Sequence, residues 1–164
     1  MNEKLYKLGI DIGSTTVKIA ILDEQDNLIF SDYERHFANI QETLSNLLHK
    51  AFDSTGEIMV SPMITGSGGL TLAKHLGIDF VQEVIAVSTA LTHYAPQTDV
   101  AIELGGEDAK IIYFENGNVE QRMNGICAGG TGSFIDQMAS LIQTDASGLY
   151  EYAKNYKAIY PIAA

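Results

Sequence analysis

The chain is poor in cysteine, in basic residues and in long apolar runs. Cys127 is the only cysteine among 164 residues, so a disulfide within the chain is excluded. The 10 lysines and arginines are outnumbered by 21 aspartates and glutamates, and the net charge of −11 argues against nucleic acid and anionic membranes as partners. No signal peptide and no apolar run of about 20 residues, the length of a membrane span, are present. These absences favour a cytoplasmic protein.

The chain does have enough apolar residues to bury a core, at 46% hydrophobic and 19% charged. Alternating residues predict three antiparallel strands, and helical spacing after Asn39 predicts a helix that Asn39 caps and that ends near Gly56. Asp145 is expected to cap a last helix that reaches about Tyr156. The mixture indicates an α/β fold with a mixed sheet. The expected strands are 5–12, 17–22, 28–35, 58–65, 100–104, 109–114 and 119–124, and the other expected helices are 70–76, 81–94 and 133–143.

The stretch around which the chain is organised is the turn between the first two strands. Asp11 lies near the end of an apolar strand, and Gly13-Ser14-Thr15-Thr16 leads into a second apolar run. A glycine turn lets backbone N–H groups approach an anion, the hydroxyls add donors, and Asp11 is placed to hold a hydrated cation. The turn therefore fits a phosphate and metal site, although Gly-Ser-Thr is also a common hairpin turn.

This pattern returns 92 residues later, from position 10 to position 102. Ile10-Asp11-Ile12-Gly13 corresponds to Ile102-Glu103-Leu104-Gly105, and a lysine follows five residues after each glycine, at Lys18 and at Lys110. Two generic hairpins are the alternative. The agreement in order, chemistry and register favours two half-domains, each with a carboxylate and a glycine turn toward a shared cleft, where the carboxylates hold Mg²⁺ and orient a water.

Two such turns resemble the phosphate-binding motifs of the superfamily of actin, sugar kinases and heat-shock chaperone ATPases. This resemblance implies an RNase H-like (actin-like) lobe at residues 1–96 and the start of a second, truncated lobe at residues 97–164. The sequence is more narrowly similar to the BadF/BadG/BcrA/BcrD ATPases, which include activators of 2-hydroxyacyl-CoA dehydratases. The similarity is carried by Gly9–Lys18, Thr65–Gly68, Leu104–Lys110 and Asn124–Asp136.

The resemblance implies ATP or ADP with Mg²⁺ as ligands. Asp11 would bind Mg²⁺ through water, and Glu103 would orient the attacking water. The family usually has aspartate at the position of Glu103 and often glutamine at that of Glu107, so the first carboxylate here reaches one methylene further and the second adds negative charge near the phosphates. The phosphates would be held by Gly13, Ser14, Thr15, Thr16 and Lys18 from one side and by Gly105 and Gly106 from the other.

Cys127 has three interpretations. It is a small buried apolar residue, or a thiol activated by the N-terminus of the helix that follows. The resemblance adds a third: each subunit of a homodimer gives two cysteines to one [4Fe–4S] cluster. The second cysteine would then lie after Ala164, as would the adenosine-binding segment. The 164 residues alone are thus expected to hold no complete cluster and to be inactive, whereas the parent protein is expected to hold the cluster and to hydrolyse ATP.

The resemblance also implies a function and partners. ATP hydrolysis would drive one low-potential electron to a 2-hydroxyacyl-CoA dehydratase, with a ferredoxin or flavodoxin as electron donor. A small-molecule kinase with Glu103 as base and an actin-like module without turnover are the alternatives. The apolar ending after Ile159 favours a fragment of a longer protein over a frayed natural terminus.

Some remaining polar residues have simpler expectations. The four histidines show no metal-ligand spacing, and His49 and His75 are expected at the surface. Asp108 and Asp136 would touch a metal or cap a helix, and a solvated side chain is the simpler expectation for Asp136. The loop Thr65–Gly69 is either part of the cleft or a plain connection.

Overall fold

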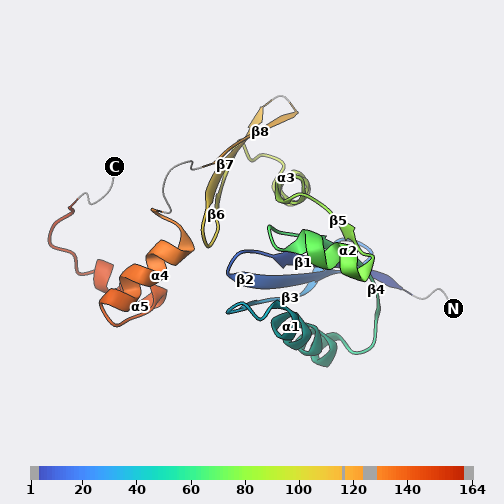
Figure 1. Ribbon diagram of the computed structural model, residues 1–164. Coiled ribbons are helices and arrows are strands. Elements are labelled where there is room, and N and C mark those ends of the chain that lie inside the picture. The colour runs from blue at the N-terminus through green and yellow to red at the C-terminus, as the bar shows by residue number, and fades with distance from the viewer. Residues whose placement is uncertain (1–3, 116, 124–128, 161–164) are drawn as a thin grey trace. The chain divides into compact units, whose positions relative to one another are not determined.

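The computed structural model describes residues 4–115, 117–123 and 129–160 (Figure 1). The chain forms two compact units, Met1–Thr98 and Asp99–Ala164, called here the first and the second unit. Each unit carries its own sheet, and each sheet contains one of the two repeated glycine turns.

The first unit is built on a mixed five-stranded sheet in the order β3-β2-β1-β4-β5. β1 runs antiparallel to β2 and parallel to β4, so β1 lies in the middle of the sheet. The mixed sheet and the α/β class are therefore confirmed. The elements are β1 (Leu5–Ile12), β2 (Thr16–Leu22), β3 (Leu28–Arg35), α1 (Ile40–Thr55), β4 (Met59–Thr65), α2 (Gly69–Leu76), β5 (Asp79–Phe80) and α3 (Glu83–Tyr94).

One face of this sheet forms the core. Alternate residues of β1 point to the same face, and the pattern of small exposed fractions on β1, β2 and β4 follows this period of two. Helix α1 contributes Leu44, Leu47 and Ala51, which lie at helical spacing, and α2 contributes Ala73. The strand residues of the core are Leu8, Ile10, Ile12, Val17, Ile19, Ile21 and Ile64.

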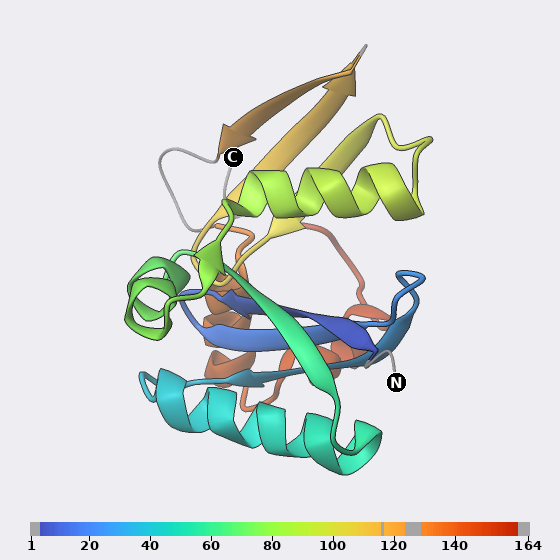
Figure 2. The ribbon, with the colours of Figure 1, turned by 90° about the vertical axis from the view of Figure 1, so that its right-hand side faces the viewer.

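The other face of the sheet is covered more loosely. Helix α3 lies over this face, opposite α1 (Figure 2). None of the α3 residues is buried, although the helix is apolar. Between the sheet and α3 lies a cavity of about 710 Å³, whose lining includes Gly9, Ala20 and Met63 from the sheet and Ala86 from the helix. Asp11 and Lys18 line the same cavity.

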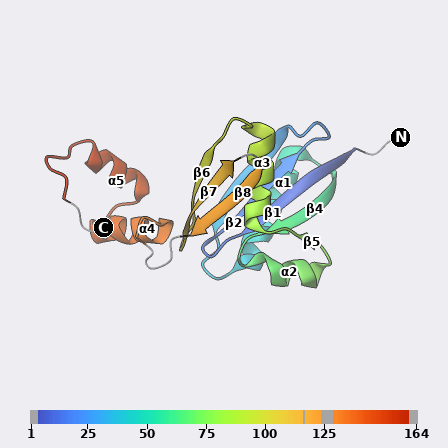
Figure 3. The same ribbon diagram turned by 90° about the horizontal axis from the view of Figure 1, so that it is seen from above.

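The second unit has a three-stranded antiparallel sheet in the order β6-β7-β8 (Figure 3). The turn between β7 and β8 contains Gly117 with φ of +79°, in the left-handed region that favours glycine. Two helices follow the sheet. The elements are β6 (Val100–Leu104), β7 (Ala109–Glu115), β8 (Asn118–Met123), α4 (Gly132–Leu141) and α5 (Ala146–Ala153).

Strand β5 is not among the expected elements, and further differences lie at helix ends. Asp145 caps α5 as expected, because its carboxylate accepts the Gly148 N–H at 2.8 Å. The helix stops at Ala153 rather than near Tyr156, and the Asn155 side-chain amide donates to the Glu151 carbonyl at the point where it stops. Asn39 occupies the N-cap of α1, but its side chain donates to Glu42 instead of capping the helix, so that detail of the prediction is wrong.

None of the helices that the structure describes combines the length and the apolar composition needed to cross a bilayer.

Candidate functional site

The first glycine turn joins β1 to β2. The Gly13 N–H donates to the Thr16 carbonyl at 2.9 Å, which brings the two strands together around Ser14 and Thr15. Among the backbone hydrogen bonds of the described residues, neither the Ser14 nor the Thr15 N–H is a donor. Ser14 is exposed and Thr15 is half-buried. The turn therefore presents two unengaged amides and the hydroxyls of small residues, which suits an anion.

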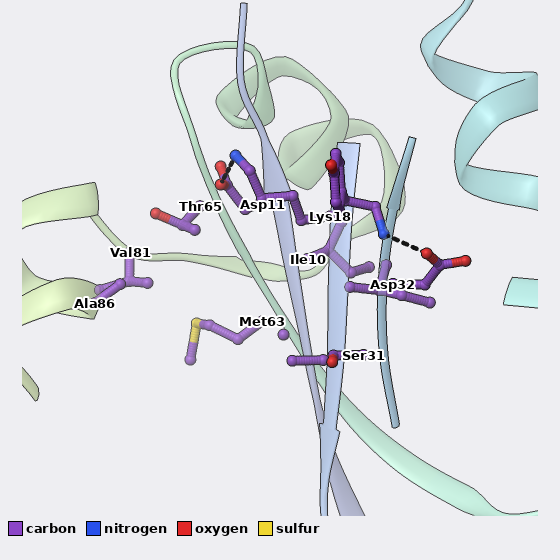
Figure 4. A pocket seen from close by; sticks show the side chains of 13 residues that line it. Ile10, Asp11, Lys18, Ser31, Asp32, Met63, Thr65, Val81 and Ala86 are labelled. Atoms are coloured by element: carbon purple, nitrogen blue, oxygen red, sulfur yellow. Dashed lines mark hydrogen bonds and ion pairs between the residues drawn. The ribbon is translucent and has the colours of Figure 1, made fainter. Parts of the chain in front are cut away.

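An ion pair lies beside this turn. Asp11 and Lys18 are directly opposite each other on β1 and β2, and Lys18 Nζ lies 2.7 Å from Asp11 Oδ2. Figure 4 shows the lysine reaching across to the carboxylate. The second oxygen, Asp11 Oδ1, is buried and has no hydrogen-bond partner. One carboxylate oxygen is thus neutralised by Lys18, while the other is left without a hydrogen-bond partner.

Strand β4 places a second unpartnered oxygen next to Asp11. Thr65 is the residue of β4 that pairs with Asp11, and its hydroxyl is also buried without a hydrogen-bond partner. Thr65 and Asp11 lie close together in Figure 4. The loop that begins at Thr65 is a candidate from the sequence, but the position of the Thr65 side chain beside Asp11 is not, because the parallel register of β1 and β4 joins segments more than 50 residues apart.

The following loop packs directly against the same carboxylate. Gly66 has φ of +97°, and a Cβ there would lie 2.5 Å from Asp11 Oδ1 and 2.3 Å from the Ile12 carbonyl oxygen. Only glycine fits this close approach. The Gly68 N–H donates to the same Ile12 carbonyl at 2.9 Å. Of the two interpretations of this loop, the geometry favours a part of the site over a plain connection.

The unpartnered oxygens fit a hydrated cation. Mg²⁺ prefers oxygen ligands and commonly keeps several of its waters, and Asp11 and Thr65, which line the cavity, each carry an oxygen without a hydrogen-bond partner. Among the described residues, no group of three or more His, Cys, Asp or Glu side chains is arranged to hold a metal ion. Contact of Asp11 with Mg²⁺ through water stays a prediction.

A second carboxylate lines the cavity further along the sheet. The Lys50 ammonium hydrogen-bonds to Asp32 at 2.8 Å and lowers the pKa of the Asp32 carboxyl below its ordinary 3.8, and the Tyr33 backbone N–H adds to this effect. Asp32 is therefore ionised near neutral pH. Lys50 also hydrogen-bonds to Glu34, and the bonds to Asp32 and Glu34 raise the pKa of Lys50 to about 12.

The second glycine turn repeats the geometry of the first. The Gly105 N–H donates to the Asp108 carbonyl at 2.8 Å, and Glu103 pairs with Lys110 across β6 and β7. Lys110 Nζ lies 3.3 Å from Glu103 Oε1 and 3.1 Å from Asp108 Oδ2. Glu103 Oε2 is buried without a hydrogen-bond partner, like Asp11 Oδ1 in the first unit. The repeat seen in the sequence is thus a repeat of hydrogen bonds and ion pairs.

Helix α4 begins at this second turn. The Gly132 N–H donates to the Gly105 carbonyl at 2.9 Å, and the Ser133 N–H donates to the Gly106 carbonyl at 2.8 Å. A Cβ at Gly132 would lie 3.3 Å from the Gly105 carbonyl oxygen, which makes the contact close. Asp108, for which the sequence offered a metal contact or a helix cap, instead pairs with Lys110.

Other singled-out residues have simpler positions or lie outside the described residues. Cys127 and the residues 124–128 around it are not among those described. His49 and His75 are exposed on their helices, as expected, and Asp136 is half-buried rather than fully solvated. His36 is buried at 8% exposure beside the first turn, a placement that no local sequence signal indicated.

The sequence is similar to those of two dehydratase activators. The chain is 30% identical to the 2-hydroxyisocaproyl-CoA dehydratase activator of Clostridioides difficile, over 92% of the chain and 58% of that protein. It is also 30% identical to the (R)-2-hydroxyglutaryl-CoA dehydratase activating ATPase of Acidaminococcus fermentans, over 94% of the chain and 61% of that protein.

The fold is likewise that of a solved activator. The structure of the activator of the 2-hydroxyisocaproyl-CoA dehydratase from Clostridium difficile with bound ADPNP superposes with a TM-score of 0.82 at 28% identity, covering 97% of this chain and 60% of that one. The chain thus spans about three fifths of the length of these relatives. The model of the BadF/BadG/BcrA/BcrD ATPase family matches residues 8–155, and the chain belongs to this family.

Proposed function

We propose that this chain is the phosphate-binding part of an ATPase that activates a 2-hydroxyacyl-CoA dehydratase. The observation that carries the proposal is the repeated turn: two copies of a carboxylate, a glycine turn and a cross-strand lysine, each with a buried, unpartnered carboxylate oxygen. Membership of the family and the similarity to two named dehydratase activators support the role of an ATPase activator.

Each residue of the first turn has a defined task in this proposal. The unengaged Ser14 and Thr15 amides and the nearby hydroxyl of Thr16 bind phosphate oxygens, while Gly13 keeps the turn narrow. Lys18 supplies positive charge, because it already lies beside the turn. Asp11 and Thr65 face the water shell of Mg²⁺. When bound, this ion would neutralise charge that develops on the phosphates.

In this proposal the second turn binds the phosphates from the side opposite the first turn. Gly105 and Gly106 bind phosphate through their backbone, and Glu103 orients the attacking water. Glu103 is suited to this task because Lys110 holds one of its oxygens while the other is unpartnered. The longer reach of glutamate compared with aspartate is compatible with holding a water.

The redox part of the proposal concerns the protein that carries this chain. Cys127 would supply one thiolate to a [4Fe–4S] cluster shared by a homodimer, and each subunit would contribute a second cysteine from outside these residues. Such a cluster supplies one-electron transfer. The donor would be a ferredoxin or flavodoxin, the acceptor the dehydratase, and the setting the cytoplasm.

The test is a pair of aspartate substitutions in the protein that carries this chain. Asp11→Ala is expected to abolish Mg²⁺-dependent ATP hydrolysis, because it removes the carboxylate that faces the cation. Asp53→Ala, which removes an exposed carboxylate on α1, is the matched control and is expected to leave hydrolysis unchanged. Hydrolysis that survives Asp11→Ala contradicts the proposed role, and ADP release that requires an added hydroxyl acceptor favours a kinase instead.

A further inference from the structure

We infer that His36 is a positioning residue that holds the first glycine turn and aims the Ser14 amide at the ligand. This inference rests on the proposed phosphate-binding function of that turn. His36 directly follows β3 and is only 8% exposed, yet it takes no part in the apolar core of the sheet. Its contacts are instead with the turn and with its own loop.

The backbone N–H and both ring nitrogens of His36 take part in hydrogen bonds. The His36 backbone N–H donates to the Thr15 carbonyl at 3.1 Å. The ring Nε2 lies 3.2 Å from the Gly13 carbonyl oxygen, and the ring Nδ1 accepts the Ala38 N–H at 3.0 Å. One histidine thus contacts two carbonyls of the same four-residue turn.

These contacts select one form of the imidazole ring. The Ala38 N–H is a donor, so Nδ1 must be the unprotonated acceptor nitrogen. In a neutral ring, Nε2 then carries the hydrogen and donates it to the Gly13 carbonyl. Both ring nitrogens are satisfied in this tautomer.

The direction of the carbonyls decides the direction of the amides. The Gly13 carbonyl and the Ser14 N–H belong to the same peptide group, and in a trans peptide they point in opposite directions. No cis peptide occurs in the described part of the chain. Because His36 draws the Gly13 carbonyl toward itself, the Ser14 N–H points away from His36. The bond to the Thr15 carbonyl has the same effect on the Thr16 N–H.

The loop after His36 has an unusual backbone that returns the chain to the ring. Phe37 and Ala38 have φ of +43° and +68°, in the left-handed region that residues with a Cβ rarely adopt. Phe37 is 85% exposed, so burial of its ring does not account for this conformation. The conformation does bring the Ala38 N–H back to Nδ1 and the Asn39 N–H to the His36 carbonyl.

Two substitutions separate the hydrogen bonds of the ring. In His36→Gln the side-chain NH₂ takes the approximate place of Nε2 and keeps a donor for the Gly13 carbonyl. In His36→Asn the side-chain oxygen takes the place of Nδ1, so the bond from Ala38 is kept and the bond to Gly13 is lost. Binding of Mg²⁺-pyrophosphate to the 164-residue chain is measured by calorimetry. We expect His36→Asn to weaken it about five- to tenfold and His36→Gln to stay close to wild type.

The outcomes distinguish this inference from the proposed function. If wild type binds and His36→Asn binds equally well, or if both variants weaken binding equally, the positioning role is wrong. If wild type does not bind pyrophosphate, the proposed function of the turn fails and the inference with it. Nitrogen NMR of the wild-type ring needs no variant to fold: protonated Nε2 with bare Nδ1 supports the inference, and the opposite tautomer overturns it.

Discussion

The two glycine turns share their hydrogen bonds but differ in what surrounds the strands that carry them. In the first unit, Ile10 of β1 is 4% exposed, whereas the corresponding Ile102 of β6 is 71% exposed. β1 lies between β2 and β4, while β6 pairs with β7 alone among the described residues. The hydrogen bonds of each turn are therefore set by residues close in sequence, whereas the burial of the strand depends on segments that are distant in sequence.

The lysines show the opposite difference. The Lys18 side chain is 49% exposed and pairs with one carboxylate, whereas Lys110 is 6% exposed and pairs with both Glu103 and Asp108. The same sequence position therefore holds a solvated ion pair in the first unit and a buried one in the second. Three predictions test these differences, beginning with the largest expected effect.

The first prediction concerns the two isoleucines. Ile10→Ala is expected to lower the free energy of unfolding by about 2–5 kcal/mol, because it leaves a cavity in a packed core. Ile102→Ala is expected to change it by no more than about 0.5 kcal/mol, since that side chain is mostly exposed. Urea denaturation of the 164-residue chain measures both. Equal losses for the two variants would mean that the burial of these isoleucines does not decide their contribution to stability.

The second prediction concerns the two lysines. Lys110→Met is expected to cost about 1–3 kcal/mol, because it leaves the partly buried Glu103 and Asp108 without their shared cation. Lys18→Met is expected to cost about 0–1 kcal/mol, as for an exposed pair. The readout is again the unfolding free energy in urea. A larger loss for Lys18→Met would mean that exposure does not decide the strength of these pairs.

The third and smallest effect concerns the ion pairs that join α1 to β3 in the first unit. The pKa of Asp32 is lowered by Lys50 and by the Tyr33 N–H, so this carboxyl stabilises the fold above its unfolded pKa, near 3.8, and the stabilisation is lost as the pH falls through the lower folded pKa. Lys50→Met removes the first cause. We expect the stability difference between wild type and Lys50→Met to be constant near neutral pH and to shrink in acid, below about pH 4.

The control for this pH dependence lies in the second unit. Arg122 pairs with Glu120 on the same strand, and this pairing raises the pKa of Arg122, but the pair joins no helix to the sheet. Arg122→Met is expected to leave the acid dependence of the first unit unchanged. A stability difference for Lys50→Met that persists unchanged at low pH would contradict the role of Asp32.

Much of the first unit follows from local patterns in the sequence. The alternation of β1 to β3, the helical spacing of α1 and the Gly13 turn are encoded within short stretches, so they were predicted with bounds close to those observed. The repeated turn was also predictable, because its residues keep the same order and spacing in both copies.

The parts that were not predicted depend on contacts between distant segments. The pairing of Thr65 with Asp11 requires the parallel register of β4, and β5 is only two residues long, too short to show a period. His36 contacts Gly13, which lies 23 residues earlier in the sequence. The residues with positive φ in the loop after His36 are Phe37 and Ala38, and neither is the glycine that would indicate such a conformation in the sequence. Such residues gain their roles from tertiary structure, which local propensity does not specify.

The central claim, that both glycine turns bind phosphate through their backbone, is tested most directly by NMR. The amide resonances of the 164-residue chain are followed while Mg²⁺-pyrophosphate is added. The account predicts that the amides of Ser14, Thr15 and Gly106 shift with one saturation curve, while those of Gly56 and Gly77, which lie in turns outside the site, stay in place. Resonances of the two turns that do not move while others saturate would contradict the account.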